Sequence, residues 1–326
     1  ILVMDVKTGD MITVSSSPGF DPNAFVDPGS SRLAKFLTSE KNPLFNRAIQ
    51  GEYALGSTFK IIVAEAALEE KAVSPDDKFF CPGYFNYGKS RYRCWKQEGH
   101  GWQNLREAIE HSCNVYFYNT GLKTGADAIS KYADIFGFGK KTRIDLPYEK
   151  SGLLPSPAWK IKNIKESWYP GDTVNFSIGQ GYFLATPIQV VRFMAAIANG
   201  GHLLRPRVCS IISGEVASGI EDSILAVSEK NLRFIRKAMF DAVNSPSGTG
   251  QAARMLPYLA GKTATAQNPH GDSHAWFSGF APYDNPEIAF LVFIEHGGGG
   301  GFISAKIAKE FLKYYFNKKE SDESKI

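Results

Sequence analysis

Apolar residues gather in short runs at both ends of the chain and recur with helical spacing in between. Runs bounded by turn residues predict two strands at the start, over residues 1–6 and 11–15. Three more strands are predicted near the end, over residues 259–267, 275–281 and 288–295. Strands at both ends with helices between them predict one α+β unit, an antiparallel sheet flanked by helices and carrying an inserted, mostly helical lobe.

The central region is predicted to be mainly helical. Apolar residues recur with helical spacing through residues 58–70, and helices are also predicted over residues 105–120 and 187–198. Residues 18–46 are rich in Pro, Asn and Ser and are predicted to be irregular. An amphipathic helix over residues 303–316 closes the pattern.

We therefore expect one domain over residues 1–316. Its sheet lobe takes residues 1–50 and 250–316, its helical lobe takes residues 57–249, and an active site would lie in the cleft between the two lobes. The charged tail over residues 317–326 is predicted to be disordered.

Composition limits the functions open to this chain. Of its 326 residues, 43% are hydrophobic and 13% are aromatic, which is enough for a substantial core. A formal charge of +4, with no basic run before the last dozen residues, argues against a nucleic-acid partner. No apolar stretch reaches the roughly 18 residues that span a membrane, and no signal peptide is visible. Because the chain opens at Ile1 inside a predicted strand, without a methionine, we expect an N-terminal part to be missing.

Three short motifs, far apart in the sequence, carry the candidate chemistry. They are Ser57-Thr58-Phe59-Lys60, Ser112-Cys113-Asn114 and Lys262-Thr263-Ala264-Thr265, in that order. Each is weak alone, since such a serine is more often a helix N-cap and such a lysine a solvated side chain. A phosphate loop at Gly261 is excluded because Leu256 stands where that motif needs glycine. The ordered trio resembles the penicillin-binding protein and serine β-lactamase superfamily.

Serine acyl transfer of that kind needs an activated nucleophile. A serine hydroxyl is weakly nucleophilic at neutral pH, so a neighbouring base must accept its proton. Ser57 and Lys60, three residues apart at the start of a helix, share one helical face. Lys60 can be that base if its pKa is lowered, either by burial or by a second cation such as Lys262.

The resemblance implies roles for the remaining motif residues. Ser112 would relay protons, and Asn114 would bind an amide carbonyl of the substrate. Thr263 and Thr265 would contact the substrate, and the backbone N–H groups of Ser57 and Thr265 would form the oxyanion hole.

Flanking segments extend the resemblance over most of the chain. The similar segments are residues 3–9, 152–160, 177–182, 186–189 and 274–277. Among them, residues 152–160 and 274–277 resemble the penicillin-binding protein 2 family, the class B enzymes of cell elongation. One residue departs from the family pattern: Ala264 stands where glycine is usual, and its methyl group can crowd substrate or antibiotic.

The family resemblance implies a serine-type D-Ala-D-Ala transpeptidase or carboxypeptidase that needs no cofactor for catalysis. Such an enzyme cross-links peptidoglycan stem peptides through a Ser57 acyl-enzyme and is acylated by β-lactams. It implies the periplasmic face of the inner membrane, with a membrane anchor and pedestal that are absent from this chain. The implied partner is the membrane glycan polymerase of the elongation machinery.

Two other functions compete with transpeptidation. A β-lactamase-like hydrolase needs a device that activates water, and the Glu-x-x-Leu-Asn motif of one such class is absent from the sequence. A non-catalytic β-lactam sensor domain would keep Ser57 and Lys60 but would only signal. The segments similar to penicillin-binding protein 2 argue against the sensor.

Three of the four cysteines lie close together in the sequence with a histidine among them. Cys81, Cys94, His100 and Cys113 make a complete tetrahedral zinc set of the closed, structural kind. Some penicillin-binding protein 2 members carry a metal site in this region, so structural zinc is one interpretation. A disulfide between Cys81 and Cys94 is another in an oxidising compartment, and the wide spacing also allows neither.

The surroundings of Cys113 and Cys209 can also be predicted. If Ser112 and Asn114 face the cleft, Cys113 between them should point away, toward the loop that carries the other candidate ligands. Cys209 lies far from this group in the sequence and is predicted to be a small core residue.

Overall fold

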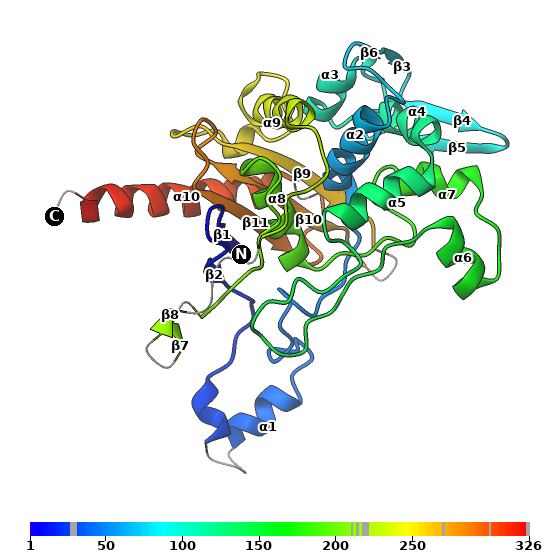
Figure 1. Ribbon diagram of the computed structural model, residues 1–326. Coiled ribbons are helices and arrows are strands. Elements are labelled where there is room, and N and C mark those ends of the chain that lie inside the picture. The colour runs from blue at the N-terminus through cyan, green and yellow to red at the C-terminus, as the bar shows by residue number, and fades with distance from the viewer. Residues whose placement is uncertain are drawn as a thin grey trace.

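The computed structural model describes residues 1–26, 31–209, 211–212, 215–216, 222–268, 271–299 and 301–323. Its centre is a five-stranded antiparallel sheet with the strand order β2–β1–β11–β10–β9 (Figure 1). The strands are β1 (Leu2–Asp5), β2 (Met11–Val14), β9 (Ala260–Ala266), β10 (His274–Ala281) and β11 (Ile288–Ile294). Both ends of the chain therefore enter one sheet, which confirms the α+β architecture predicted from the sequence.

The other elements lie mainly between β2 and β9. The helices are α1 (Ser31–Leu37), α2 (Lys60–Glu69), α3 (Leu105–Glu110), α4 (Asn114–Thr124), α5 (Ala126–Ile135), α6 (Pro157–Ile164), α7 (Pro170–Phe176), α8 (Pro187–Ala198), α9 (Glu229–Asn244) and α10 (Gly301–Glu323). Short 3-10 turns are η1 (Pro22–Phe25), η2 (Gly56–Phe59) and η3 (Gln251–Ala253). Two-stranded sheets pair β3 (Phe79–Cys81) with β6 (Gly101–Gln103), β4 (Tyr84–Tyr87) with β5 (Ser90–Arg93), and β7 (Ile211–Ile212) with β8 (Glu215–Val216).

Helices cover both faces of the central sheet, with α8 on one side and α10 on the other (Figure 1). Alternate residues of β11 enter two different cores, because successive side chains of a strand point to opposite faces. Ala289 and Leu291 belong to the main core, whereas Phe290 and Val292 pack with the inner face of α10. The sheet is therefore buried on both sides, and this rigid layer carries β9 and its motif.

One predicted helix is broken in the structure. The pattern over residues 105–120 predicts a continuous helix, but α3 ends at Glu110 and α4 begins at Asn114. Ser112 has a φ of 53°, in the left-handed region, and Cys113 is extended. Neither conformation continues a right-handed helix, and the break turns the middle motif toward the cleft.

Three further predictions of local structure are corrected. Residues 18–46 are not wholly irregular, since they contain η1 and α1. Residues 79–103 contain four short strands that the sequence pattern did not indicate. The tail from Asn317, predicted to be disordered, continues α10 as far as Glu323, and Lys319 within it pairs with Glu287 at 2.6 Å.

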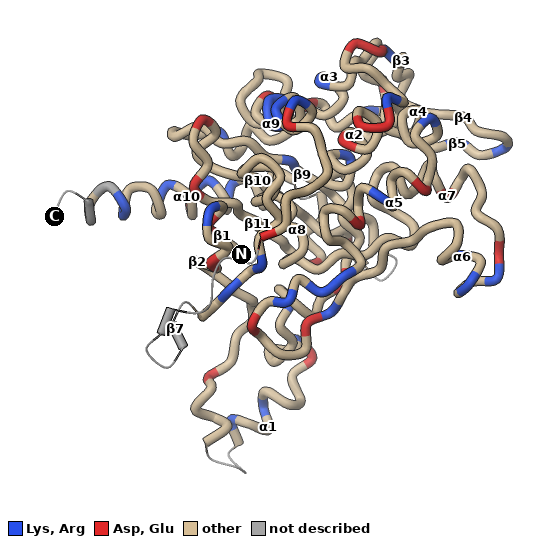
Figure 2. The backbone as a smooth tube through the Cα atoms, viewed as in Figure 1, with Lys and Arg blue, Asp and Glu red and all other residues tan. Residues whose placement is uncertain are grey.

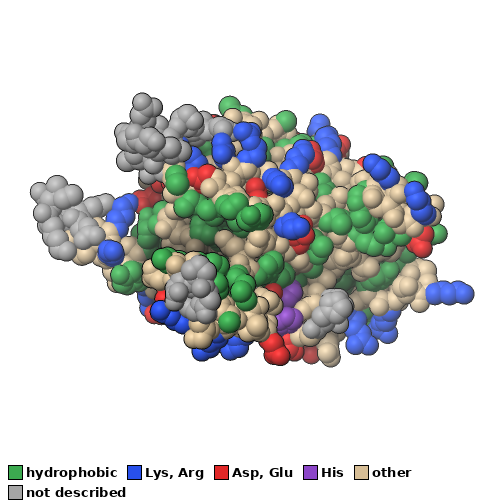
Figure 3. Space-filling model, turned by 90° about the horizontal axis from the view of Figure 1, so that it is seen from below, with side chains coloured by type: hydrophobic (Ala, Val, Ile, Leu, Met, Phe, Trp, Pro, Cys, Tyr) green, Lys and Arg blue, Asp and Glu red, His purple; other side chains and the backbone are tan. Residues whose placement is uncertain are grey.

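Charged residues of both signs are interspersed along most of the helices and loops (Figure 2). Seen from below, hydrophobic and charged side chains lie next to one another (Figure 3). Within the described ranges, no helix combines the length and the apolar character needed to cross a membrane.

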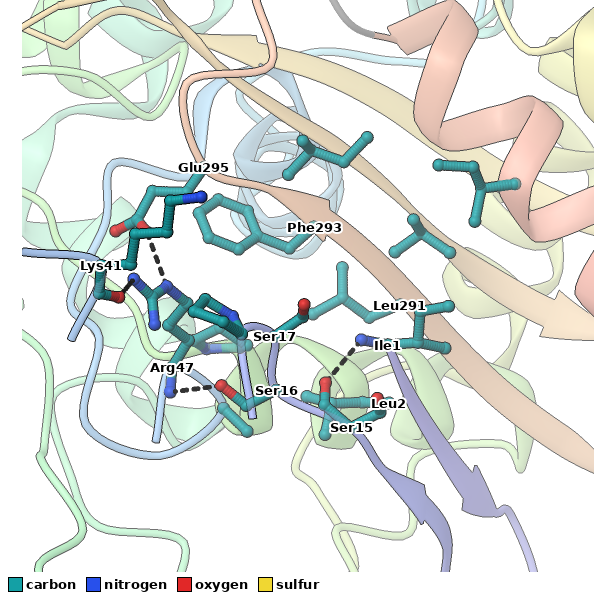
Figure 4. A pocket seen from close by; sticks show the side chains of 16 residues that line it. Ile1, Leu2, Ser15, Ser16, Ser17, Lys41, Arg47, Leu291, Phe293 and Glu295 are labelled. Atoms are coloured by element: carbon teal, nitrogen blue, oxygen red, sulfur yellow. Dashed lines mark hydrogen bonds and ion pairs between the residues drawn. The ribbon is translucent and has the colours of Figure 1, made fainter. Parts of the chain in front are cut away.

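A groove of about 490 Å³ lies at the edge of the sheet, where β11 continues past the start of β1 (Figure 4). Leu2 pairs with Leu291, and β11 runs on to Ile294 beside the groove. Arg47 and Glu295 both line the groove, and the Arg47 guanidinium pairs with the Glu295 carboxylate at 2.6 Å. No residue of the three motifs lines this groove, so the candidate chemistry lies elsewhere.

Candidate active site

The candidate nucleophile Ser57 lies on η2, directly before the helix α2. The neighbouring Phe59 fixes this turn in the core, with its ring centroid 4.4 Å from that of Phe183. Gly56 has a φ of +59°, and a Cβ there would lie 3.0 Å from the carbonyl oxygen of Thr265. Glycine is therefore required for η2 to pack against β9, which brings the backbone of the first motif beside that of the third.

Lys60 joins the first motif to the second. Its side chain is fully buried, and Nζ donates hydrogen bonds to the Ser112 carbonyl oxygen at 2.8 Å and to Asn114 Oδ1 at 2.6 Å. The Ser112 hydroxyl lies 3.3 Å from the same nitrogen. The structure thus brings two predicted site residues, Ser112 and Asn114, onto the amine of a third that lies more than 50 positions earlier in the sequence.

A neighbouring loop fixes the second motif from the other side. Trp95 Nε1 donates to the carbonyl oxygen of Ser112 at 3.2 Å. Asn114 Nδ2 donates to the carbonyl oxygen of Arg93 at 3.2 Å, so one of its two amide hydrogens is already engaged. The second hydrogen on Nδ2 is left to bind a substrate carbonyl. No sequence pattern marks Trp95, because its contacts depend on the fold of the loop.

Burial sets the protonation of the two motif lysines. Burial lowers the pKa of Lys60 from 10.5 to about 8, opposed by the nearby cysteine thiols. Burial also lowers the pKa of Lys262, and the charge of Lys60 adds to that effect. Of the two causes considered from the sequence, burial is thus the larger for Lys60. A buried amine with such a pKa can accept a proton near neutral pH.

The three motifs line one cleft of about 830 Å³. The predicted residues on its wall are Ser57, Ser112, Asn114, Thr263 and Thr265, whereas Lys60 and Lys262 lie buried behind it. Sequence reasoning missed several other wall residues, which are Trp95, Tyr118, Gln180, Thr249 and Phe302. Thr249 shares a hydrogen bond of 3.1 Å with the Thr263 hydroxyl, a contact between segments that no local pattern indicates.

Ala264 occupies a different environment from the one expected. Its side chain is 3% exposed and belongs to the main core, on the same face of β9 as Lys262 and Ala266. Ala264 is also among the residues that line the cleft, but its methyl group packs mainly against protein, so it leaves little apolar surface to crowd substrate or antibiotic.

The four candidate metal ligands lie together beside the second motif. Cys81 Sγ and Cys94 Sγ lie 3.6 Å and 3.5 Å from His100 Nδ1, and the four donor atoms, with that of Cys113, all lie within 4.8 Å of one another. All four cysteines of the chain are free. Cys113 points into this cluster while its neighbours Ser112 and Asn114 face the cleft.

The donor set fits a tetrahedral zinc ion. Zinc–sulfur and zinc–nitrogen bonds of about 2.3 and 2.0 Å at tetrahedral angles separate the two donors by about 3.5 Å, which matches the distances of 3.6 and 3.5 Å to His100. Hydrogen bonding with Cys113 lowers the pKa of Cys81 and Cys94, which favours the metal-binding thiolate form of these two, and the same bonds raise the pKa of Cys113. Cys209 is not the predicted core residue: it is exposed, and its backbone N–H is bound by Asp145.

This fold and this cleft define the class of penicillin-recognising serine acyltransferases. The family model described as "Penicillin binding protein transpeptidase domain" matches residues 1–313. Among characterised relatives, peptidoglycan D,D-transpeptidase MrdA of Haemophilus influenzae is 36% identical over 344 aligned positions, covering 98% of this chain and 53% of its own length.

Solved structures of penicillin-binding proteins have the same fold as this chain. Penicillin-binding protein PBP2 of Pseudomonas aeruginosa in complex with WCK 5153 superposes with a TM-score of 0.90 at 36% identity, covering 96% of this chain and 70% of that one. PBP2 of Helicobacter pylori in complex with MreC gives 0.89 at 35% identity, covering 96% and 59%. The chain belongs to the penicillin-binding protein transpeptidase family, as its motifs predict, and it spans about half the length of the MrdA relative.

Proposed function

We propose that this domain is a peptidoglycan D,D-transpeptidase that works through a Ser57 acyl-enzyme. The observation that carries the proposal is the buried Lys60 amine, which meets both polar groups of the second motif one helical turn from Ser57. This arrangement supplies a base with a lowered pKa, a hydroxyl to pass the proton on, and an amide to hold the substrate.

In the first half-reaction, Ser57 Oγ attacks the carbonyl carbon of the penultimate D-Ala, and its proton passes to the unprotonated Lys60 amine. The backbone N–H groups of Ser57 and Thr265 stabilise the oxyanion. When the C–N bond breaks, the departing D-Ala nitrogen takes a proton through the Ser112 hydroxyl, and Lys60 returns to its unprotonated form. A β-lactam follows the same path, but its leaving nitrogen stays tethered to the acyl group.

In the second half-reaction, an amine of an acceptor stem peptide attacks the ester, and its proton returns by way of Lys60 to Ser57. Among the described residues that line the cleft, none has a carboxylate side chain. A hydrolase that activates water with a carboxylate base is therefore less well supported than transfer to an amine.

The test uses intact mass followed by peptide mapping after incubation with benzylpenicillin. One covalent equivalent on Ser57 is expected, with none in Ser57→Ala. Transfer is then measured with a D-Ala-D-Ala donor and a D-amino acid acceptor, and the aminolysis product should exceed the hydrolysis product. Labelling that persists in Ser57→Ala would overturn the proposal, and label without turnover of any donor would favour the sensor.

We further propose that Cys81, Cys94, His100 and Cys113 hold a structural zinc ion. Through Cys113 the ion would tie the loop of residues 79–103 to the adjacent Ser112, which supports the site without touching substrate. The ion would supply stability rather than a catalytic step, because four protein ligands leave no open coordination position.

Elemental analysis of protein purified without added metal, together with thiol counting under denaturing conditions with a chelator, tests the zinc site. About one zinc per chain with all four thiols reactive supports it. Absence of zinc, with two thiols reactive only after reduction, would establish a disulfide instead.

The cellular setting is also a proposal. The family resemblance supports attachment to the inner membrane with the domain in the periplasm, and action beside a membrane glycan polymerase. The Helicobacter pylori relative is solved with MreC, so a protein of that kind is a second candidate partner. Co-purification of the full-length protein with each candidate from membranes tests both.

A further inference from the structure

The catalytic cleft has an uncommon distribution of charge. Among the described residues that line it, Arg91 and Arg93 are the only ones with charged side chains. Both come from β5, and the β4–β5 hairpin carries Lys and Arg but no Asp or Glu (Figure 2). The open wall of the cleft is therefore positive, with no carboxylate of its own to neutralise it.

The hairpin is held in register with the catalytic motif. Arg91 and Arg93 are two positions apart on β5, so their side chains leave the same face of the strand. The carbonyl oxygen of Arg93 accepts hydrogen bonds from Asn114 Nδ2 at 3.2 Å and from the Tyr118 hydroxyl at 3.1 Å. A displacement of the hairpin would therefore disturb the asparagine that is proposed to bind the substrate amide.

The two guanidinium groups are available for a ligand. Several other arginines already pair with a carboxylate, namely Arg47 with Glu295, Arg106 with Asp241 and Arg207 with Asp10. In the part of the chain that the structure describes, neither Arg91 nor Arg93 forms such an ion pair. Arg91 is instead stacked over the ring of Tyr84, with its guanidinium carbon 3.7 Å from the ring centroid. This stacking restricts the side chain and leaves the N–H donors at its edge free.

We propose that Arg91 and Arg93 form a specificity subsite for a carboxylate of the peptide donor. The inference rests on the proposed transpeptidase function. The carboxylate is one that precedes D-Ala-D-Ala, because Asn114 is proposed to bind the amide carbonyl before that dipeptide and the hairpin lies directly beside Asn114. Guanidinium groups bind carboxylates through paired N–H donors, which selects an acidic stem peptide over a neutral or amidated one.

The probes are benzylpenicillin and its analogue with a carboxylate on the α-carbon of the acylamino side chain. The two differ only by that charged group, which lies on the part of the molecule that corresponds to the upstream donor. Second-order acylation rate constants are measured for the wild-type domain, for Arg91→Gln/Arg93→Gln, and for the double Lys variant. Arg233→Gln is the matched control, since Arg233 is an exposed arginine that pairs with Glu229 on α9.

In the double Gln variant, the rate constant for the carboxylated penicillin is expected to fall about tenfold relative to that for benzylpenicillin. The loss should lie in binding rather than in the limiting acylation rate, and the double Lys variant should restore part of it. Added salt should weaken the preference of the wild-type domain for the carboxylated penicillin. The control should leave the ratio unchanged.

An unchanged ratio in the double Gln variant would overturn the inference. An equal fall for both penicillins would also overturn it, because the hairpin would then only support Asn114. Failure of the wild-type domain to react with either penicillin would instead overturn the proposed function. The outcomes of the two proposals are therefore distinguishable.

Discussion

Acylation of Ser57 is predicted to increase as the pH rises from 7 to 9, because Lys60 must lose its proton before it can act as the base. Burial lowers the pKa of Lys60 to about 8. At pH 7.4 about one fifth of Lys60 is then unprotonated, against about one part in a thousand at the ordinary value of about 10.4. Because the deprotonated form of Lys60 is the active one, the acylation rate constant should rise about fivefold between pH 7.4 and 9.5. The midpoint belongs to the pair of Lys60 and Lys262, which interact.

Stopped-flow acylation by a fluorescent penicillin, recorded from pH 6 to 10, measures the profile. Lys60→Arg keeps a positive charge that cannot be removed in this range, so its rate constant should fall by about 10²–10⁴ and lose its pH dependence. Lys131→Ala is the control, because Lys131 is an exposed lysine on α5 that pairs with Glu70. The control should keep the wild-type profile.

Two results would refute this account of the base. A rate constant that still rises tenfold per pH unit up to pH 10, with no plateau, would mean that the buried site does not lower the pKa of Lys60. Acylation of Lys60→Ala at the wild-type rate would assign proton removal from Ser57 to another group. Thermal unfolding of each variant separates these outcomes from loss of the fold.

Three further outcomes are expected. Chelation of the proposed zinc should lower the melting temperature and slow acylation, because the ligand Cys113 adjoins Ser112. An unchanged melting temperature in calorimetry and an unchanged rate in stopped-flow would contradict a coupling between the metal and the active site. Ala264→Gly should lower the free energy of unfolding by about 0.5–1 kcal/mol in a urea titration and leave acylation intact, so a large kinetic loss would reveal a role for the methyl group. Gly56→Ala should lower the free energy of unfolding by about 1–2 kcal/mol and the acylation rate constant more than tenfold, because the new Cβ would lie against the Thr265 carbonyl oxygen. A wild-type acylation rate constant would show instead that η2 and β9 adapt to the added methyl group.

The local parts of the fold follow from the sequence because they depend on periodicity and end signals. The helix predicted over residues 187–198 matches α8 at both ends, since Thr186 and Gln189 form a capping box before a continuous apolar run. The strand β9 is one residue shorter than predicted at both ends, and β11 is one residue shorter at its C-terminal end. The candidate catalytic residues could also be identified from the sequence, because each motif is a short local pattern.

Only the tertiary structure decides how those residues meet. No local pattern marks the break between α3 and α4, since the left-handed Ser112 is held by Lys60 and Trp95 from distant segments. The β4–β5 hairpin and its two cleft arginines were missed for the same reason: four-residue strands gain their stability from packing rather than from propensity.

Protonation and metal-ligand geometry likewise belong to the folded state. The sequence supplied Lys60 as a base and Ala264 as an anomaly, but burial of both side chains determines the pKa of one and the tolerance of the other. Cys81, Cys94 and Cys113 are near in sequence, yet the common orientation of their thiols toward His100 arises from β3, the segment after β5 and the start of α4. Sequence alone therefore determined which groups are present, whereas packing determined the distances and desolvation that turn those groups into a site, because both depend on residues far apart in the chain.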